Sequence, residues 1–494
     1  MRCARVLLVV GVAGVLLAGA SGCGRGAAAS GSALSWHACD TRFRCATLQV
    51  PVSYSDRHGP QTPISVVELV ASGAHPLGDV VFNPGGPGAS GVQYLEDVWS
   101  DFPESLRTQF NLVSFDPRGV GSSRPLRCLT PAGIRAWIGT NPAPATPRQI
   151  DQVVRASKSF VRGCERNASR GFIASLSTAN TARDMDRLRA ALGEPKLTYY
   201  GLSYGTFLGT VYAELFPRRI RAMVLDGAVD PALTSDTSEA EQAAGFEADL
   251  HDFLAWCTQH SSCKSGFSTT PARAYTALIA HFKRGLVLPA HLAAAFGGRQ
   301  SVDYGTAVLG VIAALYSKTS WPFLGHALAA AERGDGTDLA AAAYSYAGQK
   351  PDGSFSNILS ANMATNCLDR PAPTTIPEYT ALASHLAKSA PDFGALEAWG
   401  TLPCVYWPAR AQAQPAAAHA PGAPPILVIG STGDPATPYA WAQALAKELP
   451  RATLLTRTGP GHTAYRASAC IRRRADRYLE TLRLPPAGTV CLSN

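Results

Sequence analysis

The chain has 494 residues, of which 46% are apolar and 16% are charged, and its formal net charge is +8. This length exceeds one ordinary domain and predicts a large core with a substantial insertion or a second domain. The low charge density excludes a disordered chain. Because the positive charge is spread along the chain, with no basic run beyond Arg472-Arg473-Arg474, the sequence also predicts no nucleic-acid partner.

The first residues have the pattern of an export signal. Arg2 and Arg5 flank the start of an apolar or small run over residues 6–20, which predicts a secretory signal peptide over residues 1–22. Residues 18–20 offer a cleavage site, whereas Ala20-Ser21-Gly22-Cys23 resembles a bacterial lipoprotein box in which Cys23 is acylated. We expect an exported protein, either secreted or an envelope lipoprotein, that contacts the membrane only through this anchor.

Residues 23–38 are then expected to form a tether. Because we expect the chain to be exported, we expect its cysteines to form disulfides. Of the twelve cysteines, Cys3 lies in the signal and Cys23 in the lipoprotein box, which leaves ten for an oxidising compartment. Pairing neighbours costs the least loop-closure entropy. It predicts five disulfides: Cys39 with Cys45, Cys128 with Cys164, Cys257 with Cys263, Cys367 with Cys404, and Cys470 with Cys491. No close cysteine pairs with histidines suggest a metal site, and no metal or cofactor is predicted.

The exported part opens with strand-like segments. Residues 48–52 and 64–70 are joined by a polar turn over residues 56–60, which predicts an antiparallel hairpin. Residues 80–82 form a short buried strand that leads directly into a glycine-rich loop over residues 83–91.

Two functions compete for this loop. Its Gly86-x-Gly88-x-x-Gly91 spacing fits a dinucleotide fingerprint, but Pro84 and Pro87 each remove a backbone N–H that a pyrophosphate would need. In an α/β-hydrolase the same position holds the oxyanion-hole loop, in which a backbone N–H approaches the substrate carbonyl. We therefore expect Gly86 to donate this N–H, with Gly85 as the alternative.

The next buried strand, over residues 112–115, ends in Asp116-Pro117-Arg118-Gly119. We expect Asp116 and Arg118 to pair with each other and brace the loops around the site. Residues 146–192 are mostly helical in pattern, and residues 178–184 have the polar composition of a capped helix start.

The chain is organised around the segment Gly201-Leu202-Ser203-Tyr204-Gly205. A strand-like run over residues 197–200 precedes it and a helix-like run over residues 206–216 follows it, which is the context of a nucleophile elbow. The two glycines leave room around a sharp turn that exposes the Ser203 hydroxyl. The backbone N–H of Tyr204, which follows the nucleophile, is the expected second oxyanion donor.

Strands and helices alternate through this region, which predicts an α/β-hydrolase fold with a doubly wound, mostly parallel sheet. The alternation stops near residue 231 and resumes with strand patterns at 426–429 and 452–456. The intervening Ala-rich sequence is helical in period and predicts a large inserted cap over the site. The expected parts are a first core segment over residues 39–230, a helical cap over 231–421, and a second core segment over 422–494.

A serine at an elbow needs a base and an orienting carboxylate, which follow in the chain order Ser, acid, His. His462 lies after the last core strand, in the loop Gly459-Pro460-Gly461-His462-Thr463, and is the predicted base. Asp434, in the loop after the strand at 426–429, is the favoured acid. Asp226 follows an earlier strand and is the alternative, because some hydrolases carry the acid one strand sooner.

Several motifs together resemble the secreted tripeptidyl aminopeptidases and their mycobacterial cell-envelope serine protease relatives, over nearly all of the mature chain. They are Gly85-Gly86-Pro87-Gly88, the elbow, 226–231, Asn366-Cys367-Leu368-Asp369, 404–408, Asp434-Pro435-Ala436-Thr437-Pro438 and Gly461-His462-Thr463. The resemblance implies Ser203, Asp434 and His462 as the triad and the release of short N-terminal peptides. We also expect the protein to be a monomer. It also leaves open a carboxylesterase or an endopeptidase.

Two further expectations concern the substrate and a rival function. An aminopeptidase that measures length from its serine needs carboxylates to bind the substrate ammonium. The candidates in the cap are Glu239, Glu241, Glu247, Asp249 and Asp369, and Asp369 is preferred because a Cys367–Cys404 bridge would fix its backbone. The rival is a non-catalytic envelope binding protein on the same fold.

Overall fold

The structure, a computed structural model, describes residues 34–56, 58–293 and 296–493. The expectations for the signal peptide, its cleavage site and Cys23 lie outside the described residues. Within these ranges, no helix is both long and apolar enough to cross a membrane.

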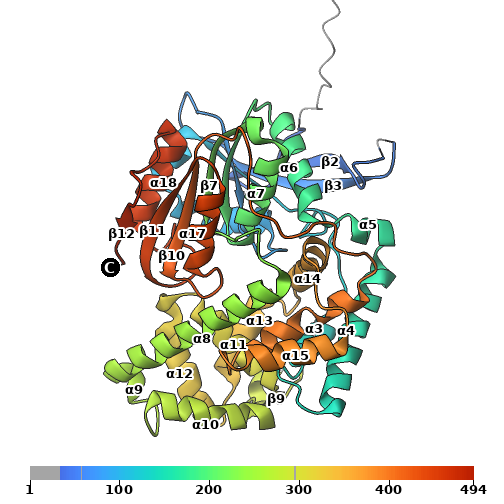
Figure 1. Cartoon of the computed structure of the whole chain (residues 1–494), viewed down its shortest axis with the longest axis vertical. Helices are drawn as coiled ribbons and strands as arrows, with labels where there is room; N and C mark the ends of the chain where they lie inside the picture. The colour runs from blue at the N-terminus through green and yellow to red at the C-terminus, as the bar shows by residue number, and fades with distance from the viewer. Residues whose placement is uncertain (1–33, 57, 294–295, 494) are drawn as a thin grey trace, which may run out of the picture. The chain divides into compact units, whose positions relative to one another are not determined.

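A ten-stranded sheet forms the centre of the core, in the order β1-β2-β3-β5-β4-β6-β7-β10-β11-β12 (Figure 1). The first three strands pair antiparallel with their neighbours, and all strands from β5 to β12 pair in parallel. The strands are β1 (His37–Ala38), β2 (Phe43–Pro51), β3 (Gln61–Leu69), β4 (Asp79–Asn83), β5 (Asn111–Phe115), β6 (Leu197–Leu202), β7 (Ile220–Asp226), β10 (Ile426–Gly433), β11 (Ala452–Pro460) and β12 (Val490–Cys491).

Helices cover both faces of this sheet, because successive strand side chains point to opposite faces and both sets are apolar. Val81 of β4 packs with residues of α6 (Thr178–Ala191), α7 (Tyr204–Leu215) and α17 (Tyr439–Glu448). Its neighbours Val80 and Phe82 pack on the other face, with α1 (Gly91–Val98), α2 (Glu104–Gln109) and α18 (Ala469–Thr481). This is the doubly wound arrangement that the strand and helix alternation predicts.

Between β7 and β10 the chain leaves the sheet and forms a helical cap (Figure 1). Its elements are α8 (Ser235–Gln259), α9 (Ser261–Lys264), α10 (Pro271–Arg284), α11 (Tyr304–Leu315), α12 (Trp321–Glu332), α13 (Thr337–Tyr346), α14 (Ile358–Asp369), α15 (Ile376–Leu386) and α16 (Gly394–Gly400). The two-residue strands β8 (Leu286–Val287) and β9 (Ser301–Val302) pair antiparallel inside it.

An earlier stretch of chain also packs on these helices. Ile134 and Ile138 of α3 (Pro131–Ile138) belong to the same apolar cluster as the cap helices α8 and α11. Val153 of α4 (Pro147–Asn167) is buried with Tyr379 and Trp399 of the cap. The cap is thus built from two segments, whereas the sequence placed only residues 231–421 in it. Short amphipathic helices do not reveal in sequence which neighbour covers them.

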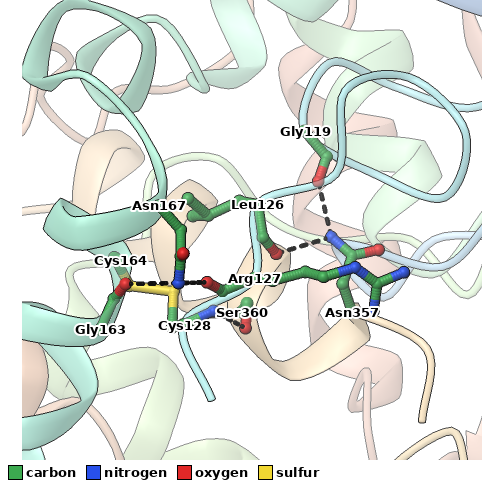
Figure 2. Close-up of a disulfide and its surroundings, with 9 residues drawn as sticks. All are labelled: Gly119, Leu126, Arg127, Cys128, Gly163, Cys164, Asn167, Asn357 and Ser360. Carbon is green, nitrogen blue, oxygen red and sulfur yellow. Dashed lines mark hydrogen bonds between the residues drawn. A yellow bond between two sulfur atoms is a disulfide. The ribbon is translucent and has the colours of Figure 1, made fainter. Parts of the chain in front are cut away.

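Ten cysteines of the described chain form five disulfides, each between cysteines that are neighbours in the sequence. Figure 2 shows the Cys128–Cys164 bridge, which ties the segment after β5 to α4. The bridges Cys39–Cys45, Cys257–Cys263, Cys367–Cys404 and Cys470–Cys491 are local to their own parts of the fold.

The expected Asp116–Arg118 pair is wrong. Arg118 instead forms a buried ion pair with Asp184 of α6, through donors 2.6 and 2.7 Å from its two oxygens. Asp116 accepts hydrogen bonds from the Ser90 hydroxyl and the backbone N–H of Ser122. The bidentate guanidinium fits the carboxylate of Asp184 better than that of a near neighbour in a tight turn.

Candidate active site

Ser203 stands at the junction of β6 and α7 with a φ of 55° and a ψ of −125°, a conformation that non-glycine residues rarely adopt. A Cβ on Gly201 would meet the carbonyl oxygen of Gly205, and one on Gly205 would lie 2.7 Å from the carbonyl oxygen of Asn83. The glycines at both ends of the elbow are therefore required by close backbone contact, as the sequence motif indicates.

The glycine-rich loop after β4 lies against this elbow. A Cβ on Gly85 would lie 2.9 Å from Ser203 Cβ and 3.1 Å from the backbone nitrogen of Tyr204. The N–H of Gly85 donates to Asn83 Oδ1 at 3.0 Å, whereas the N–H of Gly86 has no acceptor among the described residues. The geometry therefore favours Gly86 over Gly85 as the oxyanion donor.

Tyr204 opens helix α7, and the first backbone N–H groups of a helix have no partner within that helix. Gly86, Ser203 and Tyr204 line one cavity. The two expected N–H donors and the Ser203 hydroxyl thus belong to residues on the wall of one cavity, where the positive end of the α7 dipole favours a developing oxyanion.

His462 and Asp434 meet as the sequence predicts. His462 Nδ1 lies 2.8 Å from Asp434 Oδ1 and 3.0 Å from Oδ2. The same carboxylate accepts the N–H groups of Ala436, Thr437 and Thr463 at 2.8 to 3.1 Å. Asp434 is buried, so these bonds stabilise its charge and fix the ring orientation of the histidine. No hydrogen bond joins the Ser203 hydroxyl to His462, and such bonds often tighten only when substrate binds.

Burial disfavours the charged imidazolium of His462, but the charge and hydrogen bond of Asp434 outweigh it and raise the pKa of His462 above its ordinary value. A histidine that takes a proton from serine must be stabilised in its charged form. The arrangement suits that role.

Asp226, the alternative acid, has a different set of contacts. Its carboxylate accepts the N–H groups of Ala464 and Tyr465, each at 2.9 Å, and its carbonyl oxygen accepts the N–H of Ser203 at 2.9 Å. Asp226 therefore links the elbow to the loop that follows His462, and it makes no hydrogen bond to the imidazole. Burial raises the pKa of this carboxyl to about 6.

The cavity beside Ser203 has a volume of about 340 Å³, within the range of ligand pockets. Core residues form one wall. Cap residues form the rest, from α8, α11, α14, α16, the end of α13 and the segments that follow α11, α14 and α16. They include Phe246, Tyr316, Tyr346, Asn362, Asp369, Glu239 and Glu397.

Asp369 does not present a free carboxylate to this cavity. Its two oxygens accept the backbone N–H and the hydroxyl of Thr178, at 2.9 and 2.5 Å. Thr178 is the first residue of α6, where unpaired N–H groups favour a negative partner. Asp369, the acid preferred from the sequence for the substrate ammonium, thus lines the cavity and makes a helix-capping contact. Sequence spacing does not reveal this contact, because the partners are 191 residues apart.

Of the other four acids named from the sequence, Glu239 lines the cavity. Glu241 accepts from Trp441 Nε1, Glu247 accepts from the backbone of Asp392, and Asp249 is buried outside the cavity.

Sequence reasoning missed two residues of this site. Thr437 places its hydroxyl 3.3 Å from His462 Nδ1, and its position three residues after Asp434 is the signal that was available. Glu397 lies in a cap helix with no motif around it.

Comparisons with known proteins cover most of the chain. Residues 79–269 match a family described as the alpha/beta hydrolase fold, and residues 390–491 match one described as TAP-like protein. The chain is 35% identical over 459 residues to the serine protease Hip1 of Mycobacterium tuberculosis, covering 90% of this chain and 87% of that protein. It is 35% identical over 476 residues to carboxylesterase B of the same species, covering 92% and 89%. It is 28% identical over 491 residues to the tripeptidyl aminopeptidase of Streptomyces lividans, covering 94% and 88%.

Proposed function

Because this chain belongs to the α/β-hydrolase family of serine hydrolases that includes serine protease Hip1 and the tripeptidyl aminopeptidases, we propose that it releases short peptides from the N-termini of its substrates. The observation that carries the proposal is the hydrogen-bonded His462–Asp434 pair beside the Ser203 elbow, at a cavity walled by the cap. Di- and tripeptides are the expected products.

In the proposed reaction, Ser203 Oγ attacks the scissile carbonyl carbon while His462 takes the hydroxyl proton. Asp434 holds the imidazole and stabilises its positive charge. The N–H groups of Gly86 and Tyr204 stabilise the oxyanion. His462 then gives its proton to the leaving amine, and a water molecule hydrolyses the acyl-enzyme by the same steps in reverse.

We also propose that the protein acts outside the cytoplasm. Five disulfides are typical of proteins that fold in an oxidising compartment, where such bonds form and persist. Intact-mass analysis of the mature protein from its natural host tests this proposal, since it gives the processed N-terminus and any lipid attached to Cys23.

Ester hydrolysis is the second candidate, because carboxylesterase B matches this chain as closely as serine protease Hip1 does. One experiment separates the two: a panel of free and N-acetylated di-, tri- and tetrapeptide amides beside a simple ester. Cleavage of free peptides supports the aminopeptidase, cleavage of the ester alone the carboxylesterase, and equal cleavage of free and blocked peptides an endopeptidase.

A further inference from the structure

Helix α18 and the segment after it line an open pocket of about 760 Å³, which shares no residue with the cavity beside Ser203. Five of the lining residues are arginines: Arg472, Arg473, Arg474, Arg477 and Arg483. Leu484, Pro485 and Pro486 line the same pocket and add apolar surface to it. A pocket with this lining is suited to an anion that carries an apolar part, because planar guanidinium groups bind phosphate and carboxylate oxygens in pairs.

The protein supplies little negative charge to these arginines. None of the five forms an ion pair with a residue that the structure describes. Two acids, Asp476 and Glu480, also line the pocket. Burial raises the pKa of Asp476 to about 7, although its carboxylate accepts the Tyr465 hydroxyl at 2.7 Å, and burial also raises the pKa of Glu480. The pocket therefore keeps a net positive charge at neutral pH.

Helix stability does not explain where the arginines lie in α18. Four of them lie in its first nine residues, and its last turn holds no basic residue, although the helix dipole favours cations at that end. Arg473 and Arg477 are exposed and four residues apart, so their like charges are neighbours on the helix surface and repel each other. A bound anion would offset this repulsion.

Large apolar side chains are exposed beside the arginines. Leu482, at the end of α18, is 48% exposed, and Leu492, which follows the edge strand β12, is 74% exposed. The Cys470–Cys491 disulfide ties β12 to the start of α18 (Figure 1). Because Arg474 donates to Cys470 Sγ at 3.1 Å, this disulfide also holds Leu492 close to the arginines. We call the five arginines together with Leu482 and Leu492 the α18 face.

We propose that the α18 face binds an anionic phospholipid membrane, with the phosphate of a head group in the arginine pocket and the two leucines in the membrane interface. Basic residues beside exposed apolar side chains are typical of surfaces that bind anionic lipids. This contact would add to the expected anchor at Cys23. The inference goes beyond the proposed reaction at Ser203 and does not depend on it.

The test measures co-sedimentation of the mature chain with two kinds of vesicle, one of phosphatidylglycerol and phosphatidylcholine in equal parts and one of phosphatidylcholine alone. Every sample carries Cys23→Ser, so that no acyl group at this position can anchor the protein. The variant combines Arg473→Gln with Arg477→Gln. Its matched control combines Arg162→Gln with Arg166→Gln, which are also exposed arginines four residues apart, on helix α4 and outside the pocket.

We expect the wild type to bind the mixed vesicles and not those of phosphatidylcholine alone. The Arg473→Gln, Arg477→Gln variant should bind the mixed vesicles about ten- to thirtyfold more weakly, the loss expected for two basic residues at an anionic membrane surface. Its Tm should equal or exceed that of the wild type, because a repulsive pair is removed. Leu492→Ser should weaken binding about three- to tenfold through the loss of apolar burial. The control should bind within about twofold of the wild type.

Four results would overturn the inference. One is equal binding of the wild type to both kinds of vesicle, and another is binding to neither. The third is an equal loss in the variant and the control, which would mean that only net charge matters. The fourth is calorimetric binding of inorganic phosphate with no binding to vesicles, which would assign the pocket to a soluble anion.

Discussion

The backbone N–H of His462 donates to the carbonyl oxygen of Tyr316 at 2.9 Å, and the Tyr316 ring meets the imidazole edge-on with ring centres 5.3 Å apart. Tyr316 ends helix α11 of the cap. The predicted base is therefore held from two sides, by Asp434 of the core and by a residue of the inserted segment. The cap thus holds the predicted base in place as well as lining the cavity beside Ser203.

Replacing Tyr316 by alanine should lower kcat about ten- to a hundredfold on free and acetylated peptides alike, because the imidazole loses the ring that packs on it. Tyr316→Phe is the matched control. It keeps the ring and removes only the hydroxyl that bonds Tyr346. Steady-state kinetics of both variants check this, and an effect of Tyr316→Ala on one substrate class only would place Tyr316 in substrate binding instead.

Asp434→Asn should lower kcat by about a thousand- to ten-thousandfold, because an amide cannot stabilise the imidazolium or hold the required tautomer. It should also shift the acidic limb of the kcat/KM profile to lower pH. The charge of Asp434 raises the pKa of His462, and the base must be neutral to act.

Asp226→Asn should affect stability more than chemistry. The two oxygens of the Asp226 carboxylate accept the N–H groups of Ala464 and Tyr465, whereas an asparagine has only one acceptor oxygen. The variant therefore loses one of these hydrogen bonds, which loosens the loop that follows His462. We expect a lower Tm and a loss in kcat much smaller than that of Asp434→Asn. Thermal melts and kinetics measured together decide the point, and the reverse order of the two kcat losses would make Asp226 the acid.

Asn357, which precedes α14, connects the cap to the core segment after β5, and its hydrogen bonds lead to a stability prediction. Asn357 donates to the carbonyl oxygens of Gly119 and Leu126, at 2.7 and 3.0 Å (Figure 2). It also accepts the backbone N–H of Gly121 at 3.0 Å. Asn357→Ala removes all three bonds and leaves the carbonyl oxygen of Leu126 and the N–H of Gly121 unpaired, while Gly119 still accepts from Leu126. It should lower the free energy of unfolding by about 2 to 4 kcal/mol. Asn167 is an exposed asparagine near the Cys128–Cys164 disulfide, and it also donates to a backbone carbonyl. Asn167→Ala should lower the free energy of unfolding by less than about 1 kcal/mol. Denaturant melts measure both losses, and equal losses of unfolding free energy in the two variants would contradict this role of Asn357.

Much of the core could be predicted from sequence because its signals are local. Buried runs such as residues 80–82 and 426–429 lie in β4 and β10, and the family matches confirm the α/β-hydrolase fold. The glycines around Ser203 indicate the elbow, since the backbone contacts that require them occur within a few residues.

The remainder depends on contacts between distant segments. Arg118 bonds Asp184, and Asp369 caps a helix 191 residues earlier, and neither partner carries a sequence signal. In the sequence Glu397 looks like any other acid in a helix, and only the fold places it on the wall of the cavity beside Ser203. The contribution of α3 and α4 to the cap was missed for the same reason, because the pattern of a helix gives its buried face but not what covers it.

Labelling the protein with a fluorophosphonate and mapping the adduct by mass spectrometry shows directly whether Ser203 is the nucleophile of a hydrolase. We expect a single adduct on Ser203. The Ser203→Ala variant should form no adduct and should lose at least roughly a thousandfold of its peptide and ester hydrolysis at an unchanged Tm. An unlabelled Ser203, or near-normal turnover by the alanine variant, would contradict it and favour a non-catalytic binding protein on this fold.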